Sequence, residues 1–307
     1  MARSIPWQFA MLVPARHPDS GSNRALLGPH TLGIEVTDAA LAHACGLGNI
    51  DPQHGPDGIA DCSAIEAALV WPLPQANARL VTIRPDADAF GAMAVLLMRQ
   101  RGMAITGDRL RRVLEIAQWD RFDLGCWQDW QRAHPPLPRP AQVSDLGGAP
   151  LAIQALSAIA TARDRTAKDK VLATASWLAE GLIDNAAAAA AQAFQQSLIR
   201  AWNAGEIVIE TFAAGRAAHV RSVHAAGLRL GYRMAPVVLA EGQVQGRRKL
   251  TVAQFAPGHV DMKRLLADLT ALESGWGGSP TIIGSPQGAG SGLSAAVVID
   301  TIDGCMQ

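Results

Sequence analysis

The stretch Leu80–Leu97, LVTIRPDADAFGAMAVLL, decides the fold of this sequence. Arg79–Ile83 is a short apolar run, which is typical of a buried strand in a parallel sheet. After the acidic turn Arg84–Asp88, the apolar residues of Ala89–Arg101 recur near a 3.6-residue period and predict a helix. A strand, an acidic turn and a helix form half of a βαβ unit, in which ligands bind at the carboxyl ends of the strands. The stretch therefore predicts an α/β protein with a parallel sheet.

The flanking sequence extends this pattern in both directions. Before Asp184, we expect a strand at Phe9–Val13 and helices at Asp38–Cys45, Cys62–Val70, Asp108–Asp120, Pro150–Ala162 and Ala167–Leu182. A long helix from Ala186 to about Trp202 is the expected connection between two domains. After it, we expect strands at Glu206–Phe212, Pro236–Ala240 and Lys249–Phe255, and helices at Val220–Leu230, Asp261–Leu272 and from about Ser294. We thus predict an N-terminal domain at 1–185, a connecting helix at 186–204 and a smaller α/β C-terminal domain at 205–307.

Composition limits the class of protein and its partners. A chain of 307 residues suggests about two domains. With 49% hydrophobic and 18% charged residues, the chain can bury a core and is not disordered. A formal net charge of zero provides no overall field for nucleic acid or an anionic membrane. The four cysteines form no C-x-x-C pair, and neither a secretion signal nor a transmembrane segment is recognisable, so we expect a cytoplasmic protein.

Carboxylates in the acidic turn are the first candidates for chemistry. Asp86 and Asp88 lie two residues apart directly after a strand, where both side chains can enter one cleft. Hard divalent cations prefer such oxygen ligands. The structural alternative is that either aspartate only caps the helix that follows.

Further acidic and histidine residues extend this candidate metal site. Asp51 and His54 flank Pro52-Gln53 after a short apolar stretch and could bind a metal or act as a base, although a lone loop histidine is more often simply solvated. Asp120 and Asp123 stand at the end of a helix beside Trp119. Partial burial there would require a partner or a metal, and the plain alternative is a solvated helix end.

A glycine-rich stretch, 275–288, is the candidate substrate site. Gly277 and Gly278 permit a close approach of backbone N–H groups to an anion, and Ser279 adds a hydroxyl donor. The alternative is a structural turn between two elements. Arg216 and His224 lie on or beside the helix expected at Val220–Leu230, where they could bind phosphate oxygens or lie on a solvated face.

These motifs together resemble those of the DHH phosphoesterases. Residues 80–97 resemble the family's first motif, in which a strand runs into a Pro-Asp-x-Asp turn and a helix. The helix end IAQWDRFD, 116–123, resembles a later motif with a single metal-binding Asp. The Gly-Gly-Ser-Pro stretch resembles the Gly-Gly-His substrate loop of the DHH-associated C-terminal domain.

The resemblance implies a metal-dependent hydrolase for a phosphodiester, a nucleotide or a short oligonucleotide held in an interdomain cleft. It implies one or two divalent ions, most readily Mn²⁺, and assigns them the ligands Asp51, His54, Asp86, Asp88 and Asp120. His54, Arg84 and Asp86 would be catalytic. Substrate would contact Gly277, Gly278 and Ser279. Arg216 and His224 would join them if the helix expected at Val220–Leu230 lines the cleft. No membrane partner is implied, and self-association is left open.

The sequence departs from the family at several nitrogen ligands. Thr82 replaces the first-motif histidine, Ser279 replaces the loop histidine, and Asp51–His54 precedes the Asp-x-Asp motif instead of following it. Two alternatives therefore stand beside the hydrolase. One is a non-catalytic relative that binds a nucleotide or phosphate, and the other is a hydrolase for a different bond on the same scaffold.

Overall fold

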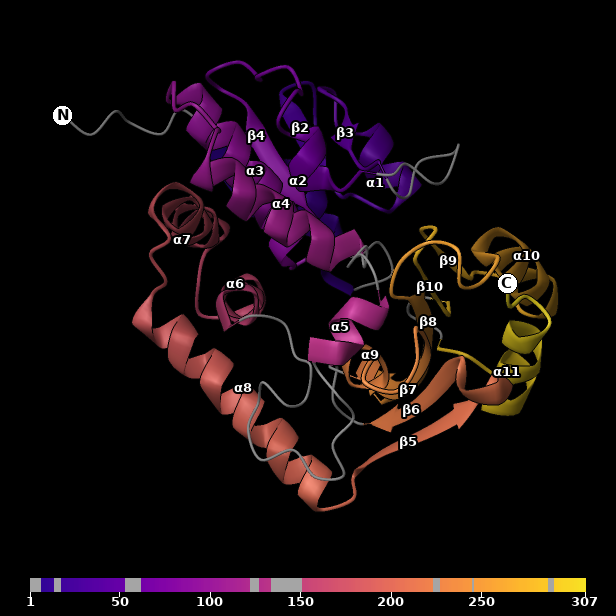
Figure 1. The fold of residues 1–307 in the computed structure, drawn as a ribbon. Coiled ribbons are helices and arrows are strands. Elements are labelled where there is room, and N and C mark those ends of the chain that lie inside the picture. Colours follow the sequence, from indigo (N-terminus) through magenta and orange to yellow (C-terminus); the bar gives the residue numbers. More distant parts are fainter. Residues whose placement is uncertain are drawn as a thin grey trace. The chain divides into compact units, whose positions relative to one another are not determined.

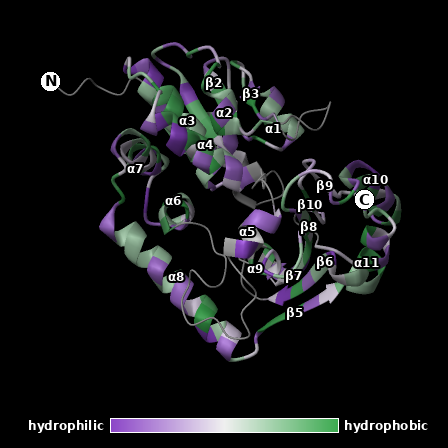
Figure 2. Cartoon of the chain, in the orientation of Figure 1, coloured by the Kyte–Doolittle hydropathy of each residue, from purple (hydrophilic) through white to green (hydrophobic). Residues whose placement is uncertain are grey.

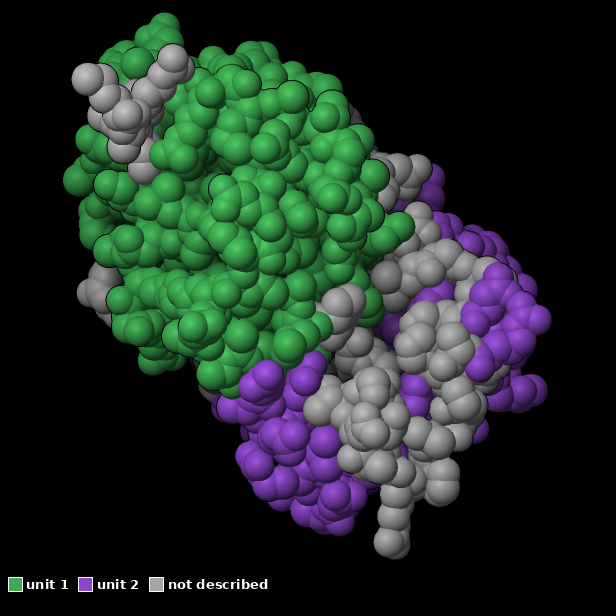
Figure 3. All heavy atoms as spheres, turned by 60° about the vertical axis from the view of Figure 1, so that its left-hand side comes forward, with its two compact units in different colours: residues 1–120, 151–191 green, residues 121–150, 192–307 purple. Residues whose placement is uncertain are grey.

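The computed structural model describes residues 7–13, 18–52, 62–121, 127–133, 151–222, 227–244, 246–286 and 290–307. The chain divides into two compact units, one of residues 1–120 and 151–191, the other of residues 121–150 and 192–307 (Figure 3). Each unit contains a sheet covered by helices, so the predicted α/β class is confirmed (Figure 1). In the described part of the chain, no helix has the length and apolar character needed to cross a membrane.

The first unit contains a four-stranded parallel sheet in the order β1-β4-β2-β3. Its strands are β1 (Gln8–Met11), β2 (Thr31–Ile34), β3 (Asn49–Ile50) and β4 (Arg79–Thr82). The helices and the 3₁₀ segment are η1 (Pro18–Ala25), α1 (Ala39–His43), α2 (Ala64–Ala67), α3 (Ala87–Gln100), α4 (Asp108–Arg121), α6 (Leu151–Thr161) and α7 (Ala167–Glu180). The strand at 79–83 and the helix after the acidic turn are thus confirmed.

Helix α3 forms the centre of this unit. Its residues from Asp88 to Met98 are all buried, because α2, α6 and α7 pack against it. Gly91 permits the close approach of α2, since a Cβ there would lie 2.6 Å from Cδ1 of Ile65. A helix that is buried on every side must carry apolar residues all round, and this explains the dense run FGAMAVLLM.

Helix α8 (Asn185–Asn203) runs from the first unit into the second. Its residues up to 191 belong to the first unit, and those from Gln192 onward belong to the second. It mixes hydrophobic and hydrophilic residues along its length (Figure 2). The other helices and 3₁₀ segments of the second unit are α5 (Trp127–Ala133), η3 (Ala213–Gly215), α9 (Gly227–Gly231), α10 (Met262–Leu272) and α11 (Ala295–Asp303). The strands are β5 (Ile207–Phe212), β6 (Ala217–Ser222), β7 (Val237–Val244), β8 (Arg247–Gln254), β9 (Gly277–Gly278) and β10 (Ile282–Gly284), in the sheet order β5-β6-β7-β8-β10-β9.

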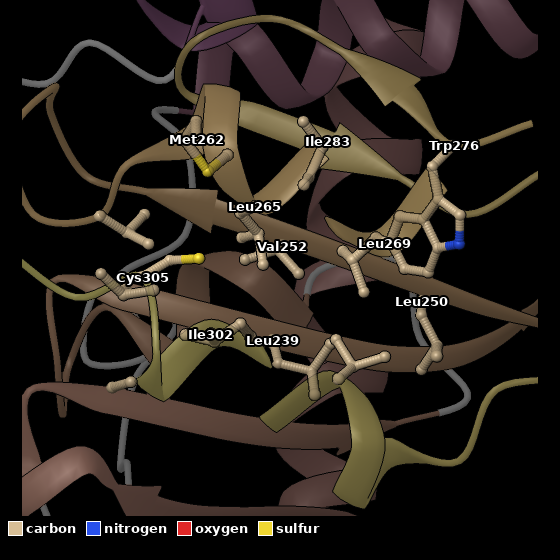
Figure 4. Close-up of a cluster of buried hydrophobic side chains, with 14 residues drawn as sticks. Leu239, Leu250, Val252, Met262, Leu265, Leu269, Trp276, Ile283, Ile302 and Cys305 are labelled. Atoms are coloured by element: carbon tan, nitrogen blue, oxygen red, sulfur yellow. The ribbon is translucent and has the colours of Figure 1, made fainter. Parts of the chain in front are cut away.

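Apolar clusters cover both faces of this six-stranded sheet. On one face, Leu239, Leu250 and Val252 pack with Leu265 and Ile302 from α10 and α11 (Figure 4). On the other face, strand residues pack with side chains of α8 and α9 and with Trp127 of α5. The sheet thus has an apolar core on each side.

The helix expected at Val220–Leu230 is wrong. Residues 217–222 form strand β6, and a short helix, α9, begins only at Gly227. Because both faces of the sheet are covered, Ala217–Val220 are all buried and lack the alternation that would have indicated a strand.

Candidate acidic site

Polar side chains gather where the parallel strands of the first unit end. Glu35 follows β2 directly, Asp51 follows β3, and Arg84 lies two residues beyond β4. Strand β2 lies between β3 and β4, so these three strand ends are neighbours at one edge of the sheet. This edge is where open α/β sheets bind their ligands.

Asp86 begins helix α3 and also pairs with Arg84. Its Oδ1 atom accepts a hydrogen bond from the N–H of Ala89 at 2.9 Å, so Asp86 is the N-cap that the structural alternative foresaw. Its Oδ2 atom lies 3.0 Å from Nε of Arg84. The turn itself is closed by Thr82, whose Oγ1 accepts from the Arg84 N–H at 3.0 Å.

Asp88 caps a different helix from the one expected. Its two carboxylate oxygens accept from the N–H groups of Ala64 and Ile65, at 2.8 and 3.0 Å, and thereby hold the start of α2. Burial raises the pKa of Asp88 well above its ordinary value, and the charges of Asp120 and Asp86 add to this effect. Asp88 therefore has a structural role at the start of α2, and the metal-binding role expected from the sequence stays a prediction.

Glu35 is the site residue that the sequence reasoning missed. Its side chain is 2% exposed, and its Oε1 lies 3.4 Å from Nη1 of Arg84. Its Oε2 is buried without a hydrogen-bond partner in the described structure. Burial is the largest cause of a strongly raised pKa of Glu35, and Asp86, Asp88 and Asp120 add to it. A charged residue directly after the apolar run TLGI was the available signal.

Arg84 is the positive charge that faces these carboxylates. Burial alone would lower its pKa, but Glu35, Asp86, Asp120 and Asp88 together raise it. Its side chain is 33% exposed, so the guanidinium is also accessible from solvent. Arg84 can therefore contact an anionic ligand while it pairs with the carboxylates.

Asp120, near the end of α4, completes the group. It contributes to the raised pKa values of Glu35 and Asp88, so α4 brings its carboxylate within electrostatic range of both. We call the group formed by Glu35, Arg84, Asp86, Asp88 and Asp120 the acidic site. Among the described residues, no three His, Cys, Asp or Glu side chains lie close enough together to hold a metal ion in the present side-chain conformations. His54 and Asp123 lie outside the described residues.

The glycine-rich stretch of the second unit is a tight hairpin. Gly277 and Gly278 form β9, which pairs with β10, and Ser279 donates its N–H to the carbonyl of Ile282 at 2.7 Å. Ser279 is buried, with its Oγ 3.3 Å from Oγ1 of Thr281. The stretch 275–288 thus contains the two short strands β9 and β10. It forms a structural turn, which was the alternative to a substrate site. Its role in binding substrate stays a prediction.

Gly278 and Gly277 provide a matched pair for testing this structural role. Gly278 has a φ of 153°, and a Cβ there would lie 2.1 Å from the carbonyl oxygen of Ile282. A Cβ at Gly277 would meet no atom of the described residues within 4 Å. We expect Gly278→Ala to lower the free energy of unfolding by about 2–3 kcal/mol and Gly277→Ala to lower it by less than about 0.5 kcal/mol. Urea unfolding of both variants measures this difference. Equal stabilities would contradict the hairpin geometry.

Arg216 and His224 are the other two substrate contacts predicted from the sequence. Arg216 is exposed and donates from Nη1 to the carbonyl of Gln307 at 3.0 Å. His224 lies outside the described residues. Nearby in the sequence, His219 is buried and lies 3.0 Å from Glu241, which also accepts from Arg248 at 2.7 Å. The helix considered for this segment is therefore wrong, since residues 217–222 form strand β6, but Arg216 is exposed as the solvated alternative described.

Comparisons with known proteins give little further guidance. No family model and no curated protein matches the chain. Among solved structures, the chain is similar to a pGpG-specific phosphodiesterase, PggH from Vibrio cholerae, with 10% identity and a TM-score of 0.36 over 83% of this chain and 92% of that one.

Proposed function

We propose that the acidic site binds a divalent cation, most readily Mn²⁺, and that the protein hydrolyses a phosphoester in a small substrate such as a nucleotide or short oligonucleotide. The observation that carries the proposal is the Oε2 atom of Glu35, a buried carboxylate oxygen without a partner in the described structure. Such an atom costs free energy unless a ligand or an ion completes its coordination.

The charges of the site fit a cation. Four carboxylates face one guanidinium, which leaves an excess of three negative charges when all groups are ionised. The raised pKa values of Glu35 and Asp88 reflect this excess together with burial. A hard divalent cation prefers carboxylate oxygens and would offset the repulsion.

The first ligands would be Glu35 and Asp86. Among the described residues, one oxygen of Glu35 has no hydrogen-bond partner, and Asp86 is about one-third exposed. Asp120 and Asp51 would add oxygens, and His54 is retained as a predicted ligand or base. When bound, the cation supplies a Lewis acid that stabilises negative charge on phosphate oxygens.

The chain's own groups would then orient the substrate and stabilise its charge. Arg84 would donate N–H groups to phosphate oxygens, because its guanidinium is partly exposed and cannot lose its proton. Asp88 would keep α2 in place beside the site through its two backbone hydrogen bonds.

Asp86→Asn gives the most direct test. Asparagine caps a helix as well as aspartate does, so α3 should begin normally while the negative charge is lost. We expect elemental mass spectrometry to find at least one equivalent of Mn²⁺, Fe or Zn in protein purified without chelator, and little in the variant. Hydrolysis of bis(p-nitrophenyl) phosphate with added Mn²⁺ should fall by about 100-fold or more. Full turnover in Asp86→Asn, with the melting temperature unchanged, would contradict the proposal.

A second function is favoured by one specific observation. Arg84 already pairs with Glu35 and Asp86, so the guanidinium can neutralise these carboxylates in place of a cation. In that case the protein would bind a nucleotide or phosphate without turnover. Nucleotide binding that is unaffected by chelator, without product and without bound metal after reconstitution, would support this alternative over hydrolysis.

A further inference from the structure

Glu35 reaches the acidic site because of an unusual backbone conformation. Its φ is +49°, in the left-handed region that residues with a Cβ rarely adopt. Such a conformation persists only where the surrounding structure holds it in place. The chain on either side of Glu35 must therefore be fixed by other contacts.

Those contacts come from β3 and mainly from one side chain. The N–H of Glu35 donates to the carbonyl of Ile50 at 2.8 Å, which extends the pairing of β2 with β3 by one residue. At the next residue, the side-chain amide of Asn49 takes over both backbone groups. Its Oδ1 accepts from the Val36 N–H at 3.2 Å, and its Nδ2 donates to the Val36 carbonyl at 3.1 Å.

Gly33 makes room for this arrangement. It is the register partner of Asn49, and a Cβ at Gly33 would lie 2.5 Å from Oδ1 of Asn49 and 3.1 Å from Cγ2 of Val36. Gly33 is not among the residues with positive φ, so its backbone does not itself require glycine. The missing side chain instead lets the Asn49 amide reach Val36.

We propose that Asn49 is a positioning residue for the acidic site. By holding both backbone groups of Val36, it fixes the left-handed turn at Glu35 and so directs that carboxylate toward Arg84. The ligand in this inference, a divalent cation, rests on the proposed function. The positioning itself rests on the hydrogen bonds and on the space at Gly33.

The chain contains a matched control for this contact. Asn23 is buried, whereas Asn49 is half-buried, and Asn23 makes the same pair of hydrogen bonds with a residue two positions beyond another strand. Its Oδ1 accepts from the Val13 N–H at 2.9 Å, and its Nδ2 donates to the Val13 carbonyl at 2.7 Å. Val13 follows β1 and adjoins no acidic-site residue in the sequence. Loss of either amide should therefore destabilise the fold similarly, but only Asn49 should affect Glu35.

The experiment compares Asn49→Ala with Asn23→Ala in the full chain. Free Mn²⁺ is measured by electron paramagnetic resonance, and the urea midpoint is measured for each variant. We expect Asn49→Ala to weaken Mn²⁺ binding by about tenfold or more, as is usual when a residue that orients a metal ligand is lost. Asn23→Ala should change the affinity less than about twofold with a similar shift of the urea midpoint. Equal effects of the two variants on Mn²⁺ affinity would overturn the proposal.

Gly33→Ala and a structural readout complete the test. Gly33→Ala leaves Asn49 unchanged but excludes its amide from Val36, so it should weaken Mn²⁺ binding as Asn49→Ala does, and it replaces that variant if Asn49→Ala does not fold. Crystal structures of Asn49→Ala and Gly33→Ala, grown without cation, should show Glu35 with a negative φ and with its carboxylate separated from Arg84. If the wild-type protein binds no Mn²⁺, the proposed function fails, and these structures still decide the positioning role. A retained positive φ at Glu35 in both variants would overturn it.

Discussion

Replacing Glu35 by glutamine is expected to weaken Mn²⁺ binding by about 100-fold, or ~2.7 kcal/mol, without destabilising the cation-free protein. Glutamine keeps the shape of the side chain and an oxygen that can accept from Arg84, which lies 3.4 Å from the carboxylate. It removes a buried negative charge that faces Asp86, Asp88 and Asp120. The same substitution therefore removes a proposed cation ligand and relieves repulsion among the carboxylates of the cation-free protein.

Isothermal titration with Mn²⁺ and thermal unfolding in the presence of a chelator measure the two effects separately. Glu210→Gln is the control, since Glu210 lies exposed on β5 in the second unit and pairs with Arg221 at 3.5 Å. It should leave both quantities unchanged within error. A Glu35→Gln protein that binds Mn²⁺ normally would remove Glu35 from the site.

The pH dependence of stability follows from the same carboxylate. The pKa of Glu35 in the folded protein lies well above the ordinary 4.5, so between these two values the folded state binds more protons than the unfolded state. The contribution of protonated Glu35 to the free energy of unfolding is complete below pH 4.5. It is lost as the pH rises through the pKa that Glu35 has in the folded protein. The cation-free wild type should therefore lose stability as the pH rises above 4.5, and Glu35→Gln should lose less.

Replacing Arg84 by methionine should lower the free energy of unfolding by an amount similar to the effect expected for Gly278→Ala. Removal of one partner from a buried ion pair typically costs 3–5 kcal/mol, and partial exposure of Arg84 reduces our expectation to about 2 kcal/mol at neutral pH. This corresponds to a melting temperature lower by roughly 4–8 °C. Without the guanidinium, the carboxylates repel one another more strongly. Acidification toward pH 5 or addition of Mn²⁺ should restore much of the lost stability.

Arg111→Met on α4 is the matched control for Arg84→Met. Arg111 pairs with Asp108 at 3.3 Å, and both side chains are mostly exposed. Such a pair contributes about 0.3–0.5 kcal/mol, so the melting temperature should hardly change. If Arg84→Met melts no lower than Arg111→Met in chelator, the central electrostatic role of Arg84 is wrong.

The sequence predicted the part of the fold that local pattern determines. The apolar run at 79–83 predicted β4, and the 3.6-residue spacing of apolar residues after the acidic turn predicted α3. In both segments the residue types favour the structure that forms. The N-cap role of Asp86, which the sequence gave as the structural alternative to metal binding, depends only on residues three positions apart. These features need no knowledge of distant parts of the chain.

Contacts between distant residues explain what the sequence did not reveal. Asp88 caps α2, which precedes it by more than 20 residues, and no spacing rule indicates that partner. Glu35 enters the site only because Asn49 and Gly33 on neighbouring strands fix its backbone. Likewise, β6 is buried on both faces by helices from elsewhere, so its residues lack the alternation typical of a strand.

The place of α5 in the chain has a consequence for biosynthesis. Trp127 belongs to the second unit, and its indole N–H donates to the carbonyl of Tyr232, which lies 105 residues later. At about 5–20 residues per second, a ribosome needs roughly 5–20 seconds to reach that partner. During this interval the first unit can close around α3, but the tryptophan of α5 still lacks the Tyr232 carbonyl and the α9 side chains of its native cluster. The nascent chain should therefore be most vulnerable to chaperone capture and proteolysis after α5 emerges and before α9 does.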